Sequence, residues 1–320
     1  MKKTLSFLTA LSHLIRLPNL LIIALTQLLL RYAIYGPFLF RDSGIEPSSL
    51  ADFLILVLIT VLIAAGGYII NDYFDVKIDA INKPDKNTID RNIPARGAIA
   101  THLIINAVAV ILGFYLAYKV GNFTFGLIFP FLSVLLWLYS ASYKRTFLWG
   151  NIIVAALSAF VVLIVWLFEF FYLRLDPASF ASLIKPLSHV TSVVLAYALF
   201  AFLVTIIREV IKDMEDAEGD HRYGCRTLPL VIGQRNSRLL IISLLILSMI
   251  MLGYGMVILY RLHYMWTFWY FLFAVQAPVI WLVTIMWRAR QKEEFHFASM
   301  LTKVIMLTGI LSMQILSLNF

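Results

Sequence analysis

Cysteine and charge are both scarce in this chain of 320 residues. Cys225 is its only cysteine, which excludes a disulfide framework and any metal site built on several thiolates. Charged residues make up 14% of the chain against 61% hydrophobic residues, and the mean hydropathy is +0.87. That composition excludes an ordinary soluble domain and predicts a membrane protein that crosses the bilayer several times.

Acidic residues are scarcer than basic ones, and they are concentrated. The chain has 18 Asp and Glu against 26 Lys and Arg, and 11 of the acids lie in the two segments 72–90 and 209–220. The net charge of +8 does not require a nucleic acid, because basic loops facing an anionic cytoplasmic leaflet account for it equally well. We therefore expect no nucleic acid partner, and the acidic segments become the candidate site.

Long apolar runs recur along the chain, each long enough to cross the ~30 Å hydrocarbon core of a bilayer as a helix. They lie near residues 18–38, 51–71, 99–119, 123–142, 150–173, 190–211, 237–259, 266–287 and 299–319. We therefore predict an all-α polytopic membrane protein with about nine transmembrane helices, folded as a single domain over residues 1–320.

Residues 1–16 differ from these spans. Lys2 and Lys3 precede apolar residues at helical spacing, which predicts an amphipathic helix on the membrane surface. A signal peptide is the alternative, and it is disfavoured because polar residues interrupt the apolar run and no small-residue cleavage site follows.

Lysine and arginine are divided unevenly between the two sides of the membrane. If the N-terminus is placed inside, only six of the 26 basic residues fall outside. They are Arg31, Arg41, Lys119, Arg174, Lys185 and Arg261. Because positive residues favour the inner side, both acidic segments are expected on the cytoplasmic side. We expect an integral protein of the bacterial inner (cell) membrane, with its active site facing the cytoplasm.

The first acidic segment directly follows the second span. Asp72, Asp75 and Asp79 occupy positions i, i+3 and i+7, with Asn71 before them. On a helix those positions share one face, where three like charges repel. A hard cation relieves this, and Mg²⁺ takes oxygen ligands while keeping positions open for phosphate oxygens. The sequence therefore predicts catalytic aspartates here that bind Mg²⁺, together with Asn71.

The second acidic segment repeats this spacing after the sixth span. Asp213, Asp216 and Asp220 again stand at i, i+3 and i+7, and Glu209 lies one turn earlier on the same face. The repeat predicts two halves of one site for metal and diphosphate, with these aspartates as further catalytic residues and metal ligands. Two solvated helix ends are the alternative, but they explain neither the repeated spacing nor the concentration of charge.

Basic residues accompany both segments. Cations beside a carboxylate–metal cluster are what a diphosphate requires, so we expect Lys144 and Lys212 to bind substrate. For the rest, a diphosphate and the positive-inside bias account for the charge equally well. These residues are Lys83, Arg91, Arg96 and Arg222.

Both motifs resemble the signatures of the UbiA-type intramembrane prenyltransferases. Asn71-Asp72-x-x-Asp75-x-x-x-Asp79 is similar to the first signature, and Lys212-Asp213-x-x-Asp216-x-x-Gly219-Asp220 to the second. Further matches are Arg16-x-Pro18-Asn19, Tyr139 to Lys144, Gly150-Asn151, and Arg226-Thr227-Leu228-Pro229 with Gly233. The resemblance covers roughly residues 14–310.

This resemblance implies a bundle of nine helices around a central cavity, open to the cytoplasmic side and laterally to lipid. It implies that Mg²⁺ on the two motifs binds a prenyl diphosphate, that the allylic C–O bond ionises, and that a lipophilic acceptor traps the carbocation. Asn19, Asn71 and Tyr139 join the basic residues as expected contacts to substrate.

The acceptor depends on finer similarity. The segment from Glu209 to Asp220 is most similar to digeranylgeranylglyceryl phosphate synthases, which implies an acceptor like geranylgeranylglyceryl phosphate. An aromatic acceptor of the quinone or tocopherol type stays open, because Arg91–Gly97 departs from the family's usual loop.

Two other classes of membrane protein compete with a prenyltransferase. Transporters place acids near the midplane at broken helices, whereas these acids stand at helix ends. A transferase that moves phosphoalcohols from nucleotide-linked lipids would carry Asp-Gly-x-x-Ala-Arg, which the sequence lacks.

Overall fold

The structure is a computed structural model that describes residues 12, 14–41, 43–82 and 94–319, with the backbone alone for residues 77–82. These residues form helices and no strand. In chain order they are α2 (Leu17–Leu29), η1 (Leu30–Phe40), α3 (Leu50–Asn82), α4 (Ala95–Lys119), α5 (Phe123–Ala141), η3 (Tyr143–Arg145), α6 (Trp149–Leu173), α7 (Pro177–Glu215), α8 (Ala217–Arg222), α9 (Leu228–Arg261), α10 (Met265–Tyr270), η4 (Phe271–Gln276), α11 (Ala277–Arg288) and α12 (Lys292–Ser317).

The described residues contain nine helical segments long and apolar enough to cross a membrane. This confirms the all-α class and the number of predicted spans, and the chain is an integral membrane protein. Most of the predicted 1–16 amphipathic helix lies outside the described residues, so it stays a prediction.

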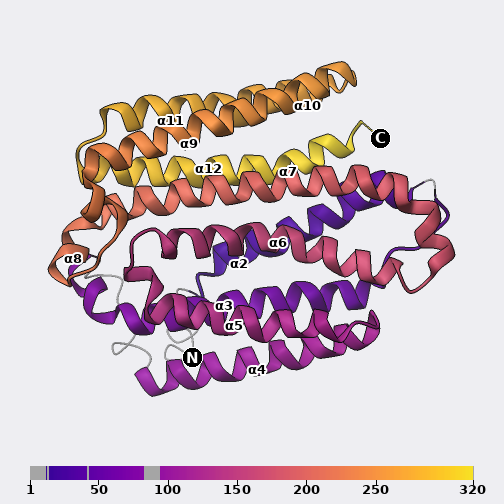
Figure 1. Cartoon of the computed structure of the whole chain (residues 1–320), viewed down its shortest axis with the longest axis horizontal. Coiled ribbons are helices and arrows are strands. Elements are labelled where there is room, and N and C mark those ends of the chain that lie inside the picture. Colours follow the sequence, from indigo (N-terminus) through magenta and orange to yellow (C-terminus); the bar gives the residue numbers. More distant parts are fainter. Residues whose placement is uncertain (1–11, 13, 42, 83–93, 320) are drawn as a thin grey trace, which may run out of the picture. The chain divides into compact units, whose positions relative to one another are not determined.

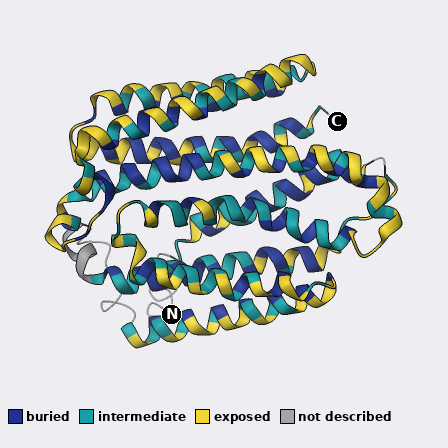
Figure 2. Ribbon diagram, in the orientation of Figure 1, coloured by how far each residue is buried: buried dark blue, intermediate teal, exposed yellow. Residues whose placement is uncertain are grey.

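Large apolar side chains remain exposed on the outside of these helices. On α4, for example, Leu103 is 60%, Ile104 63% and Ile111 68% exposed. Figure 2 shows exposed residues distributed along the length of the helices and not only at their ends. Lipid tails cover such surfaces without cost, while each helix satisfies its own backbone hydrogen bonds.

The largest differences from the predicted boundaries occur in three spans. Helix α7 begins at Pro177, 13 residues before the predicted start at 190. The prediction followed the apolar run, and the residues after Pro177 are only partly apolar. A proline nevertheless suits the first turn of a helix. Helix α3 continues to Asn82 instead of stopping at residue 71. Helix α9 begins at Leu228 instead of 237 and bends at Gly233, whose φ of 80° only glycine adopts readily.

A side-chain cap precedes α7. The Ser179 hydroxyl and the backbone N–H groups of Ala178 and Ser179 donate hydrogen bonds to the carboxylate of Asp176. The Ser179 hydroxyl and the Ala178 N–H hold the pKa of Asp176 below its ordinary value. These bonds satisfy N–H groups that a helix start leaves free.

The chain divides into two compact units. Unit 1 contains residues up to Gln27, 45–144 and 165–182, and unit 2 contains residues 28–44, 145–164 and 183–320. The expected single domain over 1–320 stays a prediction.

Unit 1 is built on α3, α4 and α5, which pack against one another and run side by side in Figure 1. Glycines allow the close approach. A Cβ on Gly66 of α3 would lie 2.3 Å from the Asn106 side chain of α4, and one on Gly113 of α4 would lie 2.2 Å from the ring of Phe129 on α5. At the end of α3 opposite the acidic motif, Ser48 donates through N–H and Oγ to the buried carboxylate of Glu169.

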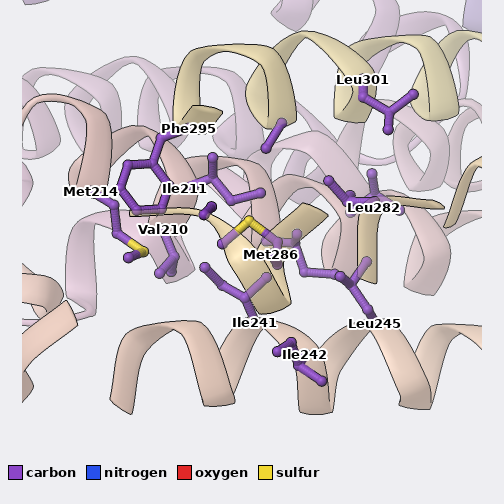
Figure 3. Packing of buried hydrophobic residues seen from close by; sticks show 14 of the residues in the cluster. Val210, Ile211, Met214, Ile241, Ile242, Leu245, Leu282, Met286, Phe295 and Leu301 are labelled. Carbon is purple, nitrogen blue, oxygen red and sulfur yellow. The ribbon is translucent and has the colours of Figure 1, made fainter. Parts of the chain in front are cut away.

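Unit 2 is held by an apolar cluster between α7, α9, α11 and α12. Figure 3 shows Val210, Ile211 and Met214 of α7 packed with Met286 of α11 and Phe295 of α12. Each of these side chains is at most 3% exposed. The cluster fixes which face of α7 is turned toward α9, α11 and α12, and therefore which face is turned away from them.

Candidate active site

The first acidic motif lies in the last turns of α3, within unit 1. Asp75 is only 2% exposed. Its Oδ2 accepts a hydrogen bond from Nδ2 of Asn71 at 2.8 Å and forms an ion pair with Lys144, just beyond α5. Because Asn71 precedes Asp75 by four residues, the helix itself brings them together. The predicted residues Asn71, Asp75 and Lys144 thus form one contact group.

Asp72 lies one turn earlier and has a different partner. Nη2 of Arg16 donates to Oδ1 of Asp72 at 2.7 Å, and the Arg16 guanidinium lies 5.0 Å from the ring centre of Tyr68. Burial opposes the charge of Arg16 and is the largest single influence on it. Asp72, Tyr68 and Asp75 together outweigh burial and raise the pKa of Arg16 above its ordinary value. Nδ2 of Asn19 donates to the Tyr68 hydroxyl at 3.4 Å.

Arg16 is therefore a contact that the predicted site residues omitted. The segment Arg16-x-Pro18-Asn19 contains the signal for this contact, but the predicted site includes only Asn19 of that segment. Arg16 stands just before α2 with a φ of 53°, which is unusual outside glycine.

The other predicted residues of unit 1 differ in their exposure, and some are not described by the structure. Tyr139 is half-buried near the end of α5, and Arg96 is exposed in the first turn of α4. Asp79 belongs to α3, but its side chain is among those that the structure does not describe. Lys83 and Arg91 lie outside the described residues.

The second acidic motif, in unit 2, is anchored to α6. Nδ2 of Asn151, in the first turn of α6, donates to Oδ2 of Asp213 at 2.8 Å. Asn151 is 7% exposed. Glu209, Asp220 and Lys212 lie near enough to Asp213 to act on its charge. Asn151 was part of the family resemblance but not of the predicted site, because its partner is 62 residues away.

The predicted single helical face of this motif is wrong for α7 and α8. Helix α7 ends at Glu215, and Asp216, with φ −93° and ψ 3°, separates it from α8. Aspartate competes with helical hydrogen bonding and favours helix ends. Asp213 therefore belongs to one helix and Asp220 to the next.

Two further pairs border this motif. Nδ1 of His296 on α12 lies 2.8 Å from Oε1 of Glu215. The predicted substrate ligand Arg222 is 59% exposed and pairs with Glu218, four residues earlier on α8. Arg222 therefore lies on the surface of unit 2, where the carboxylate of Glu218 balances its charge.

The donor atoms fit a hard cation that shares its coordination with a substrate. Within the described residues, no three His, Cys, Asp or Glu side chains gather closely enough to hold an ion by themselves. Mg²⁺ is commonly held by one or two carboxylates together with substrate phosphates. Aspartate and asparagine oxygens with few exposed atoms are suited to that arrangement.

Comparison with known proteins gives a family. A model of the UbiA prenyltransferase family matches residues 29–305. Digeranylgeranylglyceryl phosphate synthase of Methanoculleus marisnigri is 35% identical over 189 residues, so the match spans 58% of this chain and only 58% of that enzyme's length. The enzyme of the same name from Methanosphaera stadtmanae is 29% identical over 264 residues, 81% of this chain and 86% of that one.

Solved structures share the fold. One concerned with digeranylgeranylglyceryl phosphate synthase in membranes has a TM-score of 0.65 at 22% identity, and the match covers 100% of both chains. A UbiA homolog from Archaeoglobus fulgidus, bound to GPP and Mg²⁺, has a TM-score of 0.51 at 16% identity over 95% of this chain and 99% of that chain. At these identities the likeness establishes the fold alone.

Proposed function

Because the chain belongs to the UbiA prenyltransferase family, we propose that it moves a prenyl group from a prenyl diphosphate to a lipophilic acceptor in the membrane, in a Mg²⁺-dependent reaction. The observation that carries this proposal is the fixing of one aspartate in each motif by an asparagine amide: Asn71 holds Asp75, and Asn151 holds Asp213. Aspartates fixed in this way are suited to binding a metal–diphosphate in a constant geometry.

The proposed metal ligands are the residues that the sequence predicted. They are Asn71, Asp72, Asp75 and Asp79 in the first motif and Asp213, Asp216 and Asp220 in the second. Mg²⁺, when bound, neutralises the diphosphate and makes it a better leaving group. The protein's own share of catalysis is to orient the phosphates and stabilise the charge that develops on them.

Cations of this chain would bind the phosphate oxygens. Lys144 forms an ion pair with Asp75, and Arg16 forms one with Asp72. Each cation is therefore next to a proposed metal ligand. Lys212 precedes Asp213 directly, and Lys83, Arg91, Arg96 and Arg222 are kept as proposed contacts of the diphosphate or the acceptor. Asn19 and Tyr139 remain proposed contacts of the substrate.

For the acceptor we favour a glycerol phosphate ether lipid. Both named relatives are digeranylgeranylglyceryl phosphate synthases, and the surplus of basic residues suits an anionic acceptor. An aromatic acceptor is the second candidate, because the segment Arg91–Gly97 departs from the family's usual loop.

The proposed location is the cell membrane, with the acidic motifs on the cytoplasmic side, as the distribution of basic residues indicates. The expectation of a bacterial membrane gains no support from the relatives, which are archaeal.

A direct assay tests this function. Purified protein in lipid is given geranylgeranyl diphosphate with geranylgeranylglyceryl phosphate and, separately, with 4-hydroxybenzoate, homogentisate or a dihydroxynaphthoate. We expect Mg²⁺-dependent release of diphosphate and the ether product, both abolished by Asp75→Asn or by Asp216→Asn. Full turnover by a metal-stripped enzyme in EDTA would refute the metal requirement. Preferential turnover of an aromatic acceptor would refute the acceptor while leaving the prenyl transfer intact.

A further inference from the structure

Within unit 2, helix α7 has an apolar side and a polar side. Its apolar side, with Val210, Ile211 and Met214, packs into the cluster shown in Figure 3. With 3.6 residues per turn, Thr205, Glu209 and Asp213 fall on nearly the opposite side of the helix. Polar residues in a membrane helix are rare and face protein or a water-filled space. The polar side of α7 is therefore a candidate functional surface.

Helix α6 supplies contacts at both ends of that polar face. Asn151 donates to Asp213 at 2.8 Å, and the Thr205 hydroxyl donates to the Ser158 hydroxyl at 2.9 Å. As residue numbers rise on α6 they fall on α7, so the helices are antiparallel here. Glu209 stands midway between the two contacts, level with Ala155 of α6, a small residue that is 0% exposed.

Glu209 is a partly buried carboxylate that pairs with the neighbouring cation of Arg208. Its side chain is 14% exposed, and Oε1 accepts a hydrogen bond from Nη1 of Arg208 at 2.6 Å. Nε of Arg208 is buried and has no hydrogen-bond partner among the described residues. The guanidinium and the carboxylate form a charge-assisted hydrogen bond, and a carboxylate is a group that can accept a proton.

The depth of Glu209 matches the place where the new bond would form. It lies four residues before Asp213, which is roughly 6 Å along a helix, in the direction of the membrane interior. In a prenyl diphosphate the reacting carbon is attached to the diphosphate on its apolar side. A diphosphate bound at Asp213 would therefore place that carbon near the level of Glu209.

We propose that Glu209 is a catalytic general base that accepts the proton of the acceptor's hydroxyl group, a role that rests on the proposed function. The bond between the prenyl carbon and the diphosphate breaks, and its electron pair leaves with the diphosphate. The hydroxyl oxygen forms a new bond to that carbon, and its proton passes to the Glu209 carboxylate and then to solvent. An aromatic acceptor would also give up a proton, from the ring carbon after the new bond forms, so the product and not the base identifies the acceptor.

Glu209 as a purely structural partner of Arg208 would have different consequences, and Glu209→Gln separates the two roles. The amide keeps the size and a hydrogen-bond acceptor but cannot take the proton. With geranylgeranyl diphosphate and geranylgeranylglyceryl phosphate, we expect ether formation to fall about 100-fold or more. Diphosphate release should fall far less, and geranylgeraniol should appear as water captures the cation.

Two variants complete the experiment. Glu209→Asp keeps a carboxylate and should restore part of the ether formation. Glu293→Gln makes the same chemical change at an exposed position in the first turn of α12 and should behave as the wild type. Equal losses of diphosphate release and ether in Glu209→Gln, or wild-type ether formation, would overturn the role of Glu209. A wild type that releases no diphosphate would instead overturn the proposed function.

Discussion

The aspartates nearest to the proposed chemistry are each held by an asparagine, but the two asparagines come from different places. Asn71 lies one helical turn from Asp75 on α3, whereas Asn151 reaches Asp213 from α6. In both cases the amide N–H occupies one carboxylate oxygen. The other oxygen keeps its lone pairs for a further partner, so the asparagine fixes the direction in which the carboxylate can bind.

We predict that Asn151→Ala weakens the use of Mg²⁺. Removal of the group that orients a metal ligand costs about 10–100-fold in metal affinity or activity. The Mg²⁺ concentration giving half-maximal diphosphate release should rise by about that factor, while the protein stays folded in detergent. Asn236→Ala, at an exposed position on α9, is the matched control. An unchanged Mg²⁺ dependence in Asn151→Ala would contradict the orienting role.

Lys144 leads to a second prediction at this scale. It pairs with the buried Asp75 and its side chain is 34% exposed, so it can contact both the protein and a bound phosphate. Lys144→Met removes the cation but keeps the length of the side chain. We expect the KM for the prenyl diphosphate to rise about 10–100-fold, the value of a lost charged hydrogen bond.

Lys119→Met is the control for that measurement. Lys119 is 44% exposed and lies 3.8 Å from Asp52, at the end of α4 away from the acidic motif. Its replacement should leave the KM unchanged. A KM in Lys144→Met equal to that of the control would remove Lys144 from the diphosphate contacts.

At the scale of helices, close packing in unit 1 depends on glycine. A methyl group on Gly113 of α4 would enter the ring of Phe129 on α5, which is itself 1% exposed. Neither helix can move freely, because α3 contacts both of them. The close contact between α4 and α5 therefore requires glycine at position 113, because neither helix can shift to make room for a larger side chain.

We predict that Gly113→Ala destabilises the protein by about 1–3 kcal/mol, the usual cost of overpacking. Gly253→Ala on α9 is the matched control, since nothing lies within 4 Å of its added Cβ. There the alanine should stabilise the helix by about 0.5–1 kcal/mol. Thermal unfolding in detergent measures both. A stability of Gly113→Ala equal to or above that of Gly253→Ala would show that the α4–α5 contact relaxes.

At the scale of the whole molecule, the nine spans found among the described residues place successive loops on alternating sides of the membrane. Cysteine can be placed at Arg290, between α11 and α12, or at His263, between α9 and α10, in a Cys225→Ser background. Both positions are exposed. We predict that an impermeant thiol reagent labels the cysteine at 290 only after the membrane is opened and the one at 263 in intact cells. The reverse pattern would invert the topology and move the acidic motifs to the outer side.

The sequence by itself determined the class of the protein, the number of its spans and the residues of the two motifs. Lipid allows no unsatisfied backbone, so long apolar runs must be helices, and their composition is sufficient to count them. The contact between Asn71 and Asp75 was equally accessible, because residues four apart on a helix are always neighbours. The resemblance to the family could also be identified from the sequence, because it rests on the spacing of residues within short motifs.

Only the tertiary structure decided the contacts that join distant residues. Asn151 meets Asp213, Arg16 meets Asp72 and Lys144 meets Asp75 because of how helices pack, and the spacing of 56 to 69 residues between these partners carries no periodic signal. The break at Asp216 also follows from tertiary structure, because the spacing i, i+3, i+7 is compatible with a continuous helix. The position of Glu209 opposite an apolar cluster became visible only once that cluster fixed the rotation of α7 about its axis.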